Sequence, residues 1–261
     1  MFFHVIACEI AFRELCHAAS QSQNLVDFDF LTQGYHDIPG AGRAEIQKRI
    51  DAVPAGRYDA ILLGYGLCSS ILPGLTTAHT PLVIPRAHDC ITFFLGSKER
   101  YRKCFDARPG TYYYTSGWLE CATRRRGTGA TWDGASLPAG TKDSIKATYY
   151  EEWVKKYGES QADYLLTEMN RWADSYTHGT LIHFDLVQHL KLNEQVRQIC
   201  AERGWQYDEI PGDLRLLHQL LAGEWPESDF LIVSPGQTVI ATNDERIIGV
   251  APASSNGPTA A

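Results

Sequence analysis

The sequence lacks any run of about eighteen uncharged apolar residues, the length that a membrane-spanning helix requires. Its first residues, Met1 to Cys8, also lack the basic flank and the longer apolar stretch of a signal peptide, and Glu9 follows directly. We therefore expect a cytoplasmic protein that has no membrane among its partners, and we expect its first residues to form a strand.

Positive charge is scarce as well. Only 24 Lys and Arg residues stand against 31 Asp and Glu residues, which gives the 261-residue chain a formal net charge of -7. Such a surface repels phosphate backbones, and the run Arg124 to Arg126 is too short to reverse this repulsion. The composition thus excludes nucleic acid as a partner and leaves a small-molecule substrate. It is compatible with a homo-oligomer.

No internal repeat and no low-complexity linker divides the chain. Its length and its 44% hydrophobic residues suit one α/β core. We expect residues 1–252 to form a single domain with a lid-like insertion near residues 115–146, where Gly, Thr and Ser are frequent. We expect residues 253–261 to form a disordered tail.

Short apolar runs alternate with segments of helical pattern, which is typical of an α/β fold. In the first half, the predicted strands are residues 2–7, 60–63 and 81–85, and the predicted helices are residues 9–19, 67–75 and 91–104. In the second half, the predicted helices are residues 150–176, 185–203 and 213–222, and the predicted strands are residues 207–210, 229–234 and 238–242. Because the apolar runs barely alternate and crossovers are right-handed, we predict a doubly wound, mainly parallel sheet with helices on both faces.

Seven cysteines, an odd number, are the most informative residues of the chain. In a reducing compartment they are expected to be thiols or metal ligands rather than disulfides. Cys8 closes the first predicted strand, Cys68 lies in the turn after the second, and His88-Asp89-Cys90 follows the third. Since ligands of open α/β sheets bind beyond the carboxyl ends of the strands, we predict a metal site at Cys8, Cys68, His88 and Cys90.

These donor atoms are compatible with two kinds of metal centre. Cysteine and histidine together suit a tetrahedral zinc ion, whose fourth position can activate a substrate thiol for methyl or other alkyl transfer. Cys8, Cys68 and Cys90 without histidine suit a [4Fe-4S] cluster whose open iron acts as a Lewis acid, with His88 as proton donor, in dehydration or condensation. A zinc-dependent transferase is favoured over an iron-sulfur lyase.

Three charged residues beside these ligands are predicted to take part in catalysis. Arg86 can hold a substrate carboxylate through a bidentate ion pair. Asp89 can orient a neighbouring ligand, and Glu9 can supply a general base.

Three further residues are predicted to line a cofactor pocket. Tyr65 and Gly66 lie in a tight turn where the backbone can approach a ligand closely, and Trp118 ends an aromatic strand-like segment near the lid. The turn at Gly64-Tyr65-Gly66 lacks the rest of a dinucleotide fingerprint, so we predict no nicotinamide cofactor.

Three motifs carry a resemblance to a known family. They are Gly64 to Cys68, Pro85 to Ile91 with Leu95-Gly96-Ser97 behind it, and Pro109 to Tyr112 closing in Gly117-Trp118. Together they resemble the DUF1638 family of uncharacterised bacterial and archaeal proteins over most of the chain. The resemblance implies no established reaction. Family members look like companions of corrinoid-dependent methyl metabolism, which implies a corrinoid protein as a partner.

Two local likenesses support the two metals. The pair His88 and Cys90 with a distant Cys8 or Cys68 is similar to the ligands of zinc methyltransferases that pass a methyl group from a corrinoid to a thiol, although those enzymes are barrels whose distant cysteine lies downstream. The three cysteines are similar to those of quinolinate synthase, although here all three fall in the first third of the chain. A non-catalytic protein that binds a metal or corrinoid for delivery is the third hypothesis.

Overall fold

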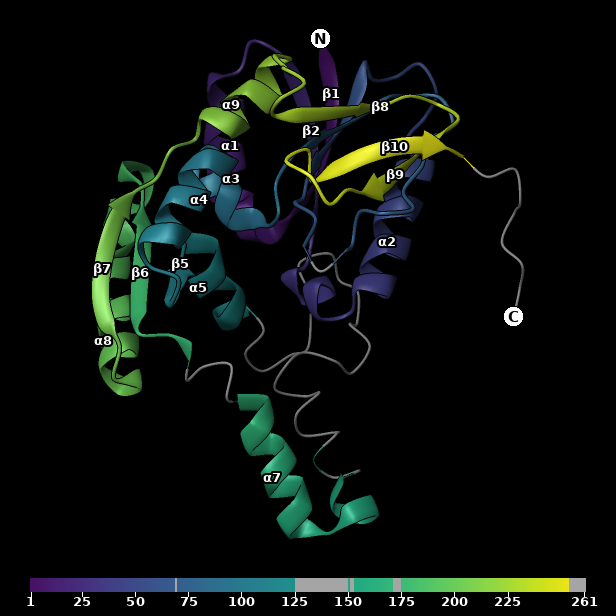
Figure 1. Cartoon of the computed structure of the whole chain (residues 1–261). Coiled ribbons are helices and arrows are strands. Elements are labelled where there is room, and N and C mark those ends of the chain that lie inside the picture. Colours follow the sequence, from purple (N-terminus) through teal and green to yellow (C-terminus); the bar gives the residue numbers. More distant parts are fainter. Residues whose placement is uncertain (69, 125–149, 151–152, 171–174, 254–261) are drawn as a thin grey trace. The chain divides into compact units, whose positions relative to one another are not determined.

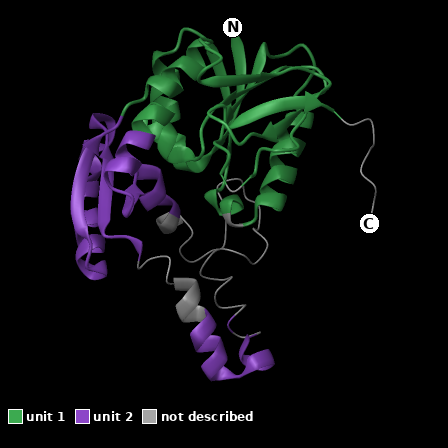
Figure 2. Ribbon diagram, in the orientation of Figure 1, with its two compact units in different colours: residues 1–101, 213–261 green, residues 102–212 purple. Residues whose placement is uncertain are grey.

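The fold was obtained as a computed structural model, which describes residues 1–68, 70–124, 150, 153–170 and 175–253. The chain divides into two compact units, residues 1–101 with 213–261 and residues 102–212 (Figure 2). Among the described residues, no helix has the length and apolar character needed to cross a bilayer.

A five-stranded sheet forms the core of the first unit (Figure 1). Its strands, in spatial order, are β2 (Leu25–Leu31), β1 (Phe2–Cys8), β3 (Ala60–Gly64), β4 (Leu82–Pro85) and β8 (Phe230–Val233). The first four are parallel, and β8 is antiparallel to β4. Every residue of β3 and β4 is buried, which is why their sequences are continuous apolar runs rather than alternating ones.

The other elements of the first unit connect these strands. They are η1 (Glu9–Ala11), α1 (Phe12–Gln21), η2 (Gln33–Asp37), α2 (Pro39–Asp51), α3 (Cys90–Leu95), α4 (Lys98–Ala107, which runs on into the second unit), α9 (Arg215–Ala222) and the antiparallel hairpin of β9 (Gln237–Ala241) and β10 (Ile248–Pro252). The predicted helix 91–104 is broken at Gly96, whose φ of 78° ends α3. The predicted helix 67–75 is wrong, because Cys68, Ser70 and Gly74 all have positive φ there.

A separate three-stranded parallel sheet forms the core of the second unit. Its strands are β5 (Thr111–Tyr114), β6 (His178–His183) and β7 (Gln206–Pro211), in that order, and its helices are α5 (Ser116–Arg124), α7 (Glu159–Asn170), η4 (Asp185–Leu190) and α8 (Leu192–Arg203). The predicted helix 150–176 is interrupted at Gly158 (φ 84°), and the predicted helix 185–203 at Lys191 (φ 50°). Strand β6 was not predicted, because its apolar run is short and is flanked by a glycine and by histidines at both ends of the strand.

The α/β class and the mainly parallel central sheet are confirmed. The strands predicted at residues 207–210, 229–234 and 238–242 correspond to β7, β8 and β9. Most of the lid-like insertion predicted near residues 115–146 lies outside the described residues, as do residues 254–261 of the predicted tail. The single domain, the lid and the disordered tail therefore stay predictions.

Candidate functional site

The candidate site lies at the carboxyl edge of the parallel strands of the first unit. Cys8 is the last residue of β1, and the residue before it, Ala7, is opposite Gly64 at the end of β3. A side chain at Gly64 would place its Cβ 2.5 Å from the Cβ of Ala7, so only glycine permits this close strand pairing. The chain that leaves β3 therefore starts beside Cys8.

The loop after β3 is fixed against the segment after β4. The amide of Leu67 donates to the carbonyl of Ala87 (2.8 Å), and the amide of Cys68 donates to the carbonyl of His88 (2.9 Å). A Cβ at Gly66 would lie 2.9–3.0 Å from the backbone of Asp89, so the two segments pack without room for a side chain. These contacts bring Cys68 next to the segment that carries Cys90.

The Cys90 thiol interacts electrostatically with the thiols of Cys68 and Cys8. Burial raises the pKa of Cys90 well above its ordinary value, and the neighbouring groups Cys68, Asp89 and Cys8 raise this pKa further. Burial, and then Asp89, raises the pKa of Cys68 to about 12. Cys8 and Cys68 are buried, with 3% and 4% of their surface exposed. The structure thus joins the loop of Cys68 to the segment of Cys90 by backbone hydrogen bonds, and Cys8 ends the strand that neighbours β3.

Asp89 holds the start of α3, the helix that begins with Cys90. One carboxylate oxygen accepts from the amide of Ile91 (3.0 Å), and the other accepts from the hydroxyl of Tyr101 (2.9 Å). Burial raises the pKa of Asp89, whereas these hydrogen bonds lower it. These contacts hold the start of α3, where Cys90 lies; the orientation of a metal ligand by Asp89 and its part in catalysis stay predictions.

His88 differs from the three cysteines in its surroundings. Its side chain is exposed, and within the described residues its imidazole makes no hydrogen bond. It acts electrostatically on Asp89 and is not among the groups that shift the pKa of Cys90. Within the described residues, no three or more His, Cys, Asp and Glu side chains are arranged around a single metal position. The four-residue zinc site therefore stays a prediction.

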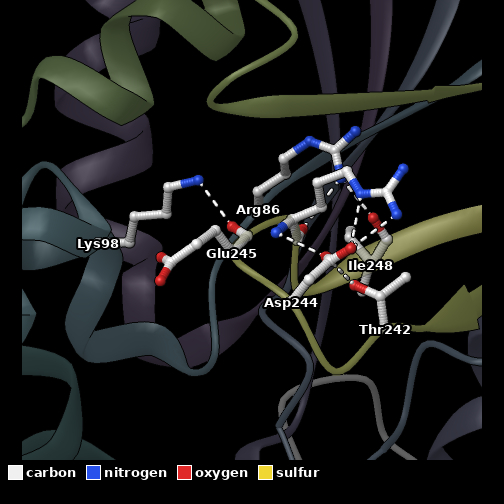
Figure 3. A network of polar contacts seen from close by, with 7 residues as sticks. Arg86, Lys98, Thr242, Asp244, Glu245 and Ile248 are labelled. Carbon is white, nitrogen blue, oxygen red and sulfur yellow. Dashed lines mark hydrogen bonds and ion pairs between the residues drawn. The ribbon is translucent and has the colours of Figure 1, made fainter.

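Arg86 is buried, with 5% of its surface exposed, and it binds backbone rather than lying open (Figure 3). Its Nε donates to the carbonyls of Glu227 (2.8 Å) and Phe230 (3.2 Å), and its Nη1 donates to those of Arg246 (3.0 Å) and Ile248. Burial lowers its pKa. These bonds fasten β8 and β10 to the end of β4. The predicted binding of a substrate carboxylate by Arg86 stays a prediction.

Glu9 is buried beside Cys8, with 4% of its surface exposed. Its Oε1 accepts from the hydroxyl of Thr32 (3.0 Å) and from the amide of Gln33 (2.9 Å). Glu9 thus holds the chain that leaves β2 at the same edge of the sheet. Its role as a general base is untested by these contacts.

The predicted cofactor-pocket residues lie in different units. Tyr65 is buried (2% exposed), and it precedes Gly66 in the loop that leads to Cys68. Trp118 belongs to α5 in the second unit, where its ring lies 6.3 Å from that of Tyr112. Tyr112 also packs against Trp205, with 5.9 Å between ring centroids, so Trp118 is part of an aromatic cluster. Cofactor binding by Tyr65, Gly66 and Trp118 stays a prediction.

A comparison with known families places this site in context. The family described as "Protein of unknown function (DUF1638)" matches residues 30–221. The chain belongs to the DUF1638 family. The match contains Cys68, His88 and Cys90 but begins after Cys8, and it confirms the resemblance seen in the sequence motifs. No curated protein and no solved structure matches this DUF1638 chain, so the reaction has to be inferred from the site itself.

The sequence analysis missed a group of polar residues in the second unit. His183, Asp185 and Glu209 lie at or near the carboxyl ends of β6 and β7. The buried run Thr180 to Ile182 between two histidines was the signal that could have located β6 and, with it, this group.

Proposed function

We propose that Cys8, Cys68 and Cys90 hold a soft metal centre, and that this DUF1638 protein is a metalloenzyme acting on a small molecule. One observation carries the proposal: Cys8 ends β1, and the hydrogen bond from the Cys68 amide to the His88 carbonyl joins the loop after β3 to the segment of Cys90, at the carboxyl edge of a parallel sheet. In open α/β sheets this edge is where ligands bind.

The chemistry of the three thiols fits a bound metal. The charged groups that act on Cys90 are two thiols and a carboxylate, all of them anionic when ionised. Thiolates so placed would repel one another. A metal cation supplies the opposing charge, and thiols that bind a metal lose their protons. The cysteines would thus act as a site that is ionised only when the metal is held.

The arrangement favours an iron-sulfur cluster over a single zinc ion. Zinc requires all its donor atoms about 2.0–2.3 Å from one point, whereas the thiolates of a [4Fe-4S] cluster each bind a different iron and can lie farther apart. Cys68 and Cys8 act electrostatically on Cys90, and His88 is not among the groups that do so; the donors grouped in this way are thiols, as a cluster requires. A cluster held by three cysteines supplies one open iron as a Lewis acid for a hydroxyl or carboxylate group.

The chain's own residues would serve such a site in separate ways. Asp89 holds Cys90 at the start of α3 through its bonds to Ile91 and Tyr101. His88, which is exposed and two residues from Cys90, would exchange a proton with the substrate. An iron-sulfur lyase is therefore the function that we propose first.

A zinc-dependent methyl transferase is the second candidate. The exposed imidazole of His88 supports it, because this side chain has no hydrogen bond within the described residues that would hold it away from a metal shared with Cys90. A corrinoid protein would then be the methyl donor. The third candidate function for the same ligands is that of a protein that binds a metal or corrinoid and catalyses no reaction.

The finer features of fold and setting belong to the same proposal. We propose a doubly wound first unit with helices on both faces of its sheet, a cytoplasmic location that keeps the thiols reduced, and no nucleic-acid or membrane partner. Assembly into a homo-oligomer is compatible with it.

The test is elemental analysis and an absorption spectrum of protein purified without oxygen. About three or four irons per chain with broad absorption in the blue support the cluster, and about one zinc without visible absorption supports the second candidate. Cys68→Ser and Cys90→Ser should each lose the metal, while Cys200→Ser, a matched change at a buried thiol of the second unit, should retain it. Absence of bound metal after reconstitution with iron and sulfide, and with zinc, would refute the proposal.

A further inference from the structure

The three-stranded sheet of the second unit has different neighbours on its two faces. Gly179 of β6 faces α8, because a Cβ on this glycine would lie 2.4 Å from the sulfur of Cys200. Thr180, the next residue of the strand, therefore points to the opposite face. The register places Thr180 beside Tyr113 of β5 and Asp208 of β7, so these side chains share that face.

A cavity of about 150 Å³ lies on this face. Residues of the strands and of the chain at the end of α4 form it, and its lining includes Tyr113, Thr180, Asp208, Ile210, Ala107 and Arg108. All of its lining residues belong to the second unit. A cavity of this size holds a molecule as large as benzene, which has roughly six non-hydrogen atoms.

Thr180 brings a buried hydroxyl to this cavity. Its side chain is 2% exposed, and its Oγ1 has no hydrogen-bond partner among the described residues. Such a group is rare in folded proteins, because burial removes its hydrogen bonds to water and nothing replaces them. A bound molecule with a polar group would supply the missing partner.

Arg108 and Asp208 bring opposite charges to the same cavity. Nη1 of Arg108 donates to Oδ2 of Asp208 (2.5 Å), and Oδ1 of Asp208 accepts from the amide of Glu209 (2.9 Å). Nε and Nη2 of Arg108 have no partner among the described residues, and each carboxylate oxygen can accept a second hydrogen bond. Both side chains are partly exposed, so a ligand can reach this remaining capacity.

We propose that this cavity binds a small zwitterion, an amino acid with a short side chain. Its ammonium group donates to Asp208 and to the hydroxyl of the neighbouring Thr180, and its carboxylate accepts from the free N–H groups of Arg108. Ala107 and Ile210 supply apolar surface for the short side chain. A ligand of one charge fits less well, because Arg108 repels a cation and Asp208 repels an anion. This site does not rest on the proposed metal centre.

The experiment titrates the full-length protein with L-alanine by isothermal titration calorimetry, at constant ionic strength near neutral pH. Sodium propionate and ethylammonium chloride are the comparison ligands, because the first lacks the ammonium group and the second lacks the carboxylate. L-Alanine should bind about tenfold more tightly than either, or better. Arg108→Gln should weaken L-alanine binding about tenfold or more, since it removes a charge-assisted contact.

Thr180→Val tests the buried hydroxyl with two measurements of opposite sign. Valine has nearly the same shape and lacks the hydroxyl, so the free protein should unfold at a higher urea concentration. The same change should weaken L-alanine binding about fivefold or more, because the ammonium group of the ligand loses an acceptor.

The matched control is Arg197→Gln. Arg197 of α8 pairs with Glu209, the residue after Asp208 in β7, and it lies outside the cavity. The affinity for L-alanine should therefore be unchanged in this variant. The proposal is overturned if L-alanine does not bind, if propionate or ethylammonium binds as tightly, or if either Arg108→Gln or Thr180→Val leaves the affinity intact.

Discussion

Replacing Arg86 with methionine should lower the free energy of unfolding by about 3–5 kcal/mol. The guanidinium donates to four backbone carbonyls, and two of these bonds, to Phe230 and Ile248, are buried. A buried carbonyl that loses a charged donor costs about 1.5–2.5 kcal/mol, whereas the partly exposed carbonyls of Glu227 and Arg246 can bind water instead. Methionine fills much of the space without supplying a donor.

Equilibrium unfolding in urea measures this loss. The matched control is Arg246→Gln, because the Arg246 side chain is 67% exposed and its ion pair with Asp244 lies at the surface; it should change the free energy of unfolding by less than about 1 kcal/mol. If Arg86→Met were as stable as Arg246→Gln, the assignment of a structural role to Arg86 would be wrong. The result would then favour the predicted binding of a substrate carboxylate by Arg86.

Two further changes test other parts of the first unit. Burial lowers the pKa of His4 despite the opposing charges of Asp29 and Asp27. As the pH falls below about 6.5, the unfolded chain therefore takes up a proton at His4 before the folded protein does, and the wild type should lose stability. His4→Gln should flatten this dependence of the urea midpoint on pH, and an unchanged slope would contradict the prediction. Gly66→Ala would push a Cβ against the backbone of Asp89 at 2.9–3.0 Å, so it should cost about 1–3 kcal/mol and reduce metal retention. The control Gly40→Ala, with nothing within 4 Å of the added Cβ, should be neutral or stabilising, and equal effects of the two would count against the close packing of the loop.

The sequence alone was sufficient for the elements whose pattern is local. The runs that form β3 and β4 are continuously apolar because parallel strands in a core are covered along their whole length, and β1 departs from this pattern only at His4. Once those strands are located, Cys8 closes the first of them and Cys68 and Cys90 follow the next two by position in the chain, and the DUF1638 motifs surround Cys68 and Cys90. This much required no knowledge of distant contacts.

Only the tertiary structure decided the features that depend on residues far apart in the sequence. The carbonyl of Glu227 that accepts from Arg86 is 141 residues away, and nothing near Arg86 indicates that its guanidinium binds backbone. The division into two units and strand β6 were hidden for the same reason, since a short strand with a glycine is stabilised mainly by its neighbours β5 and β7. The surroundings of each donor are likewise decided by packing. The sequence groups His88 with the three cysteines, and the fold leaves the His88 side chain exposed while it buries Cys8 and Cys68.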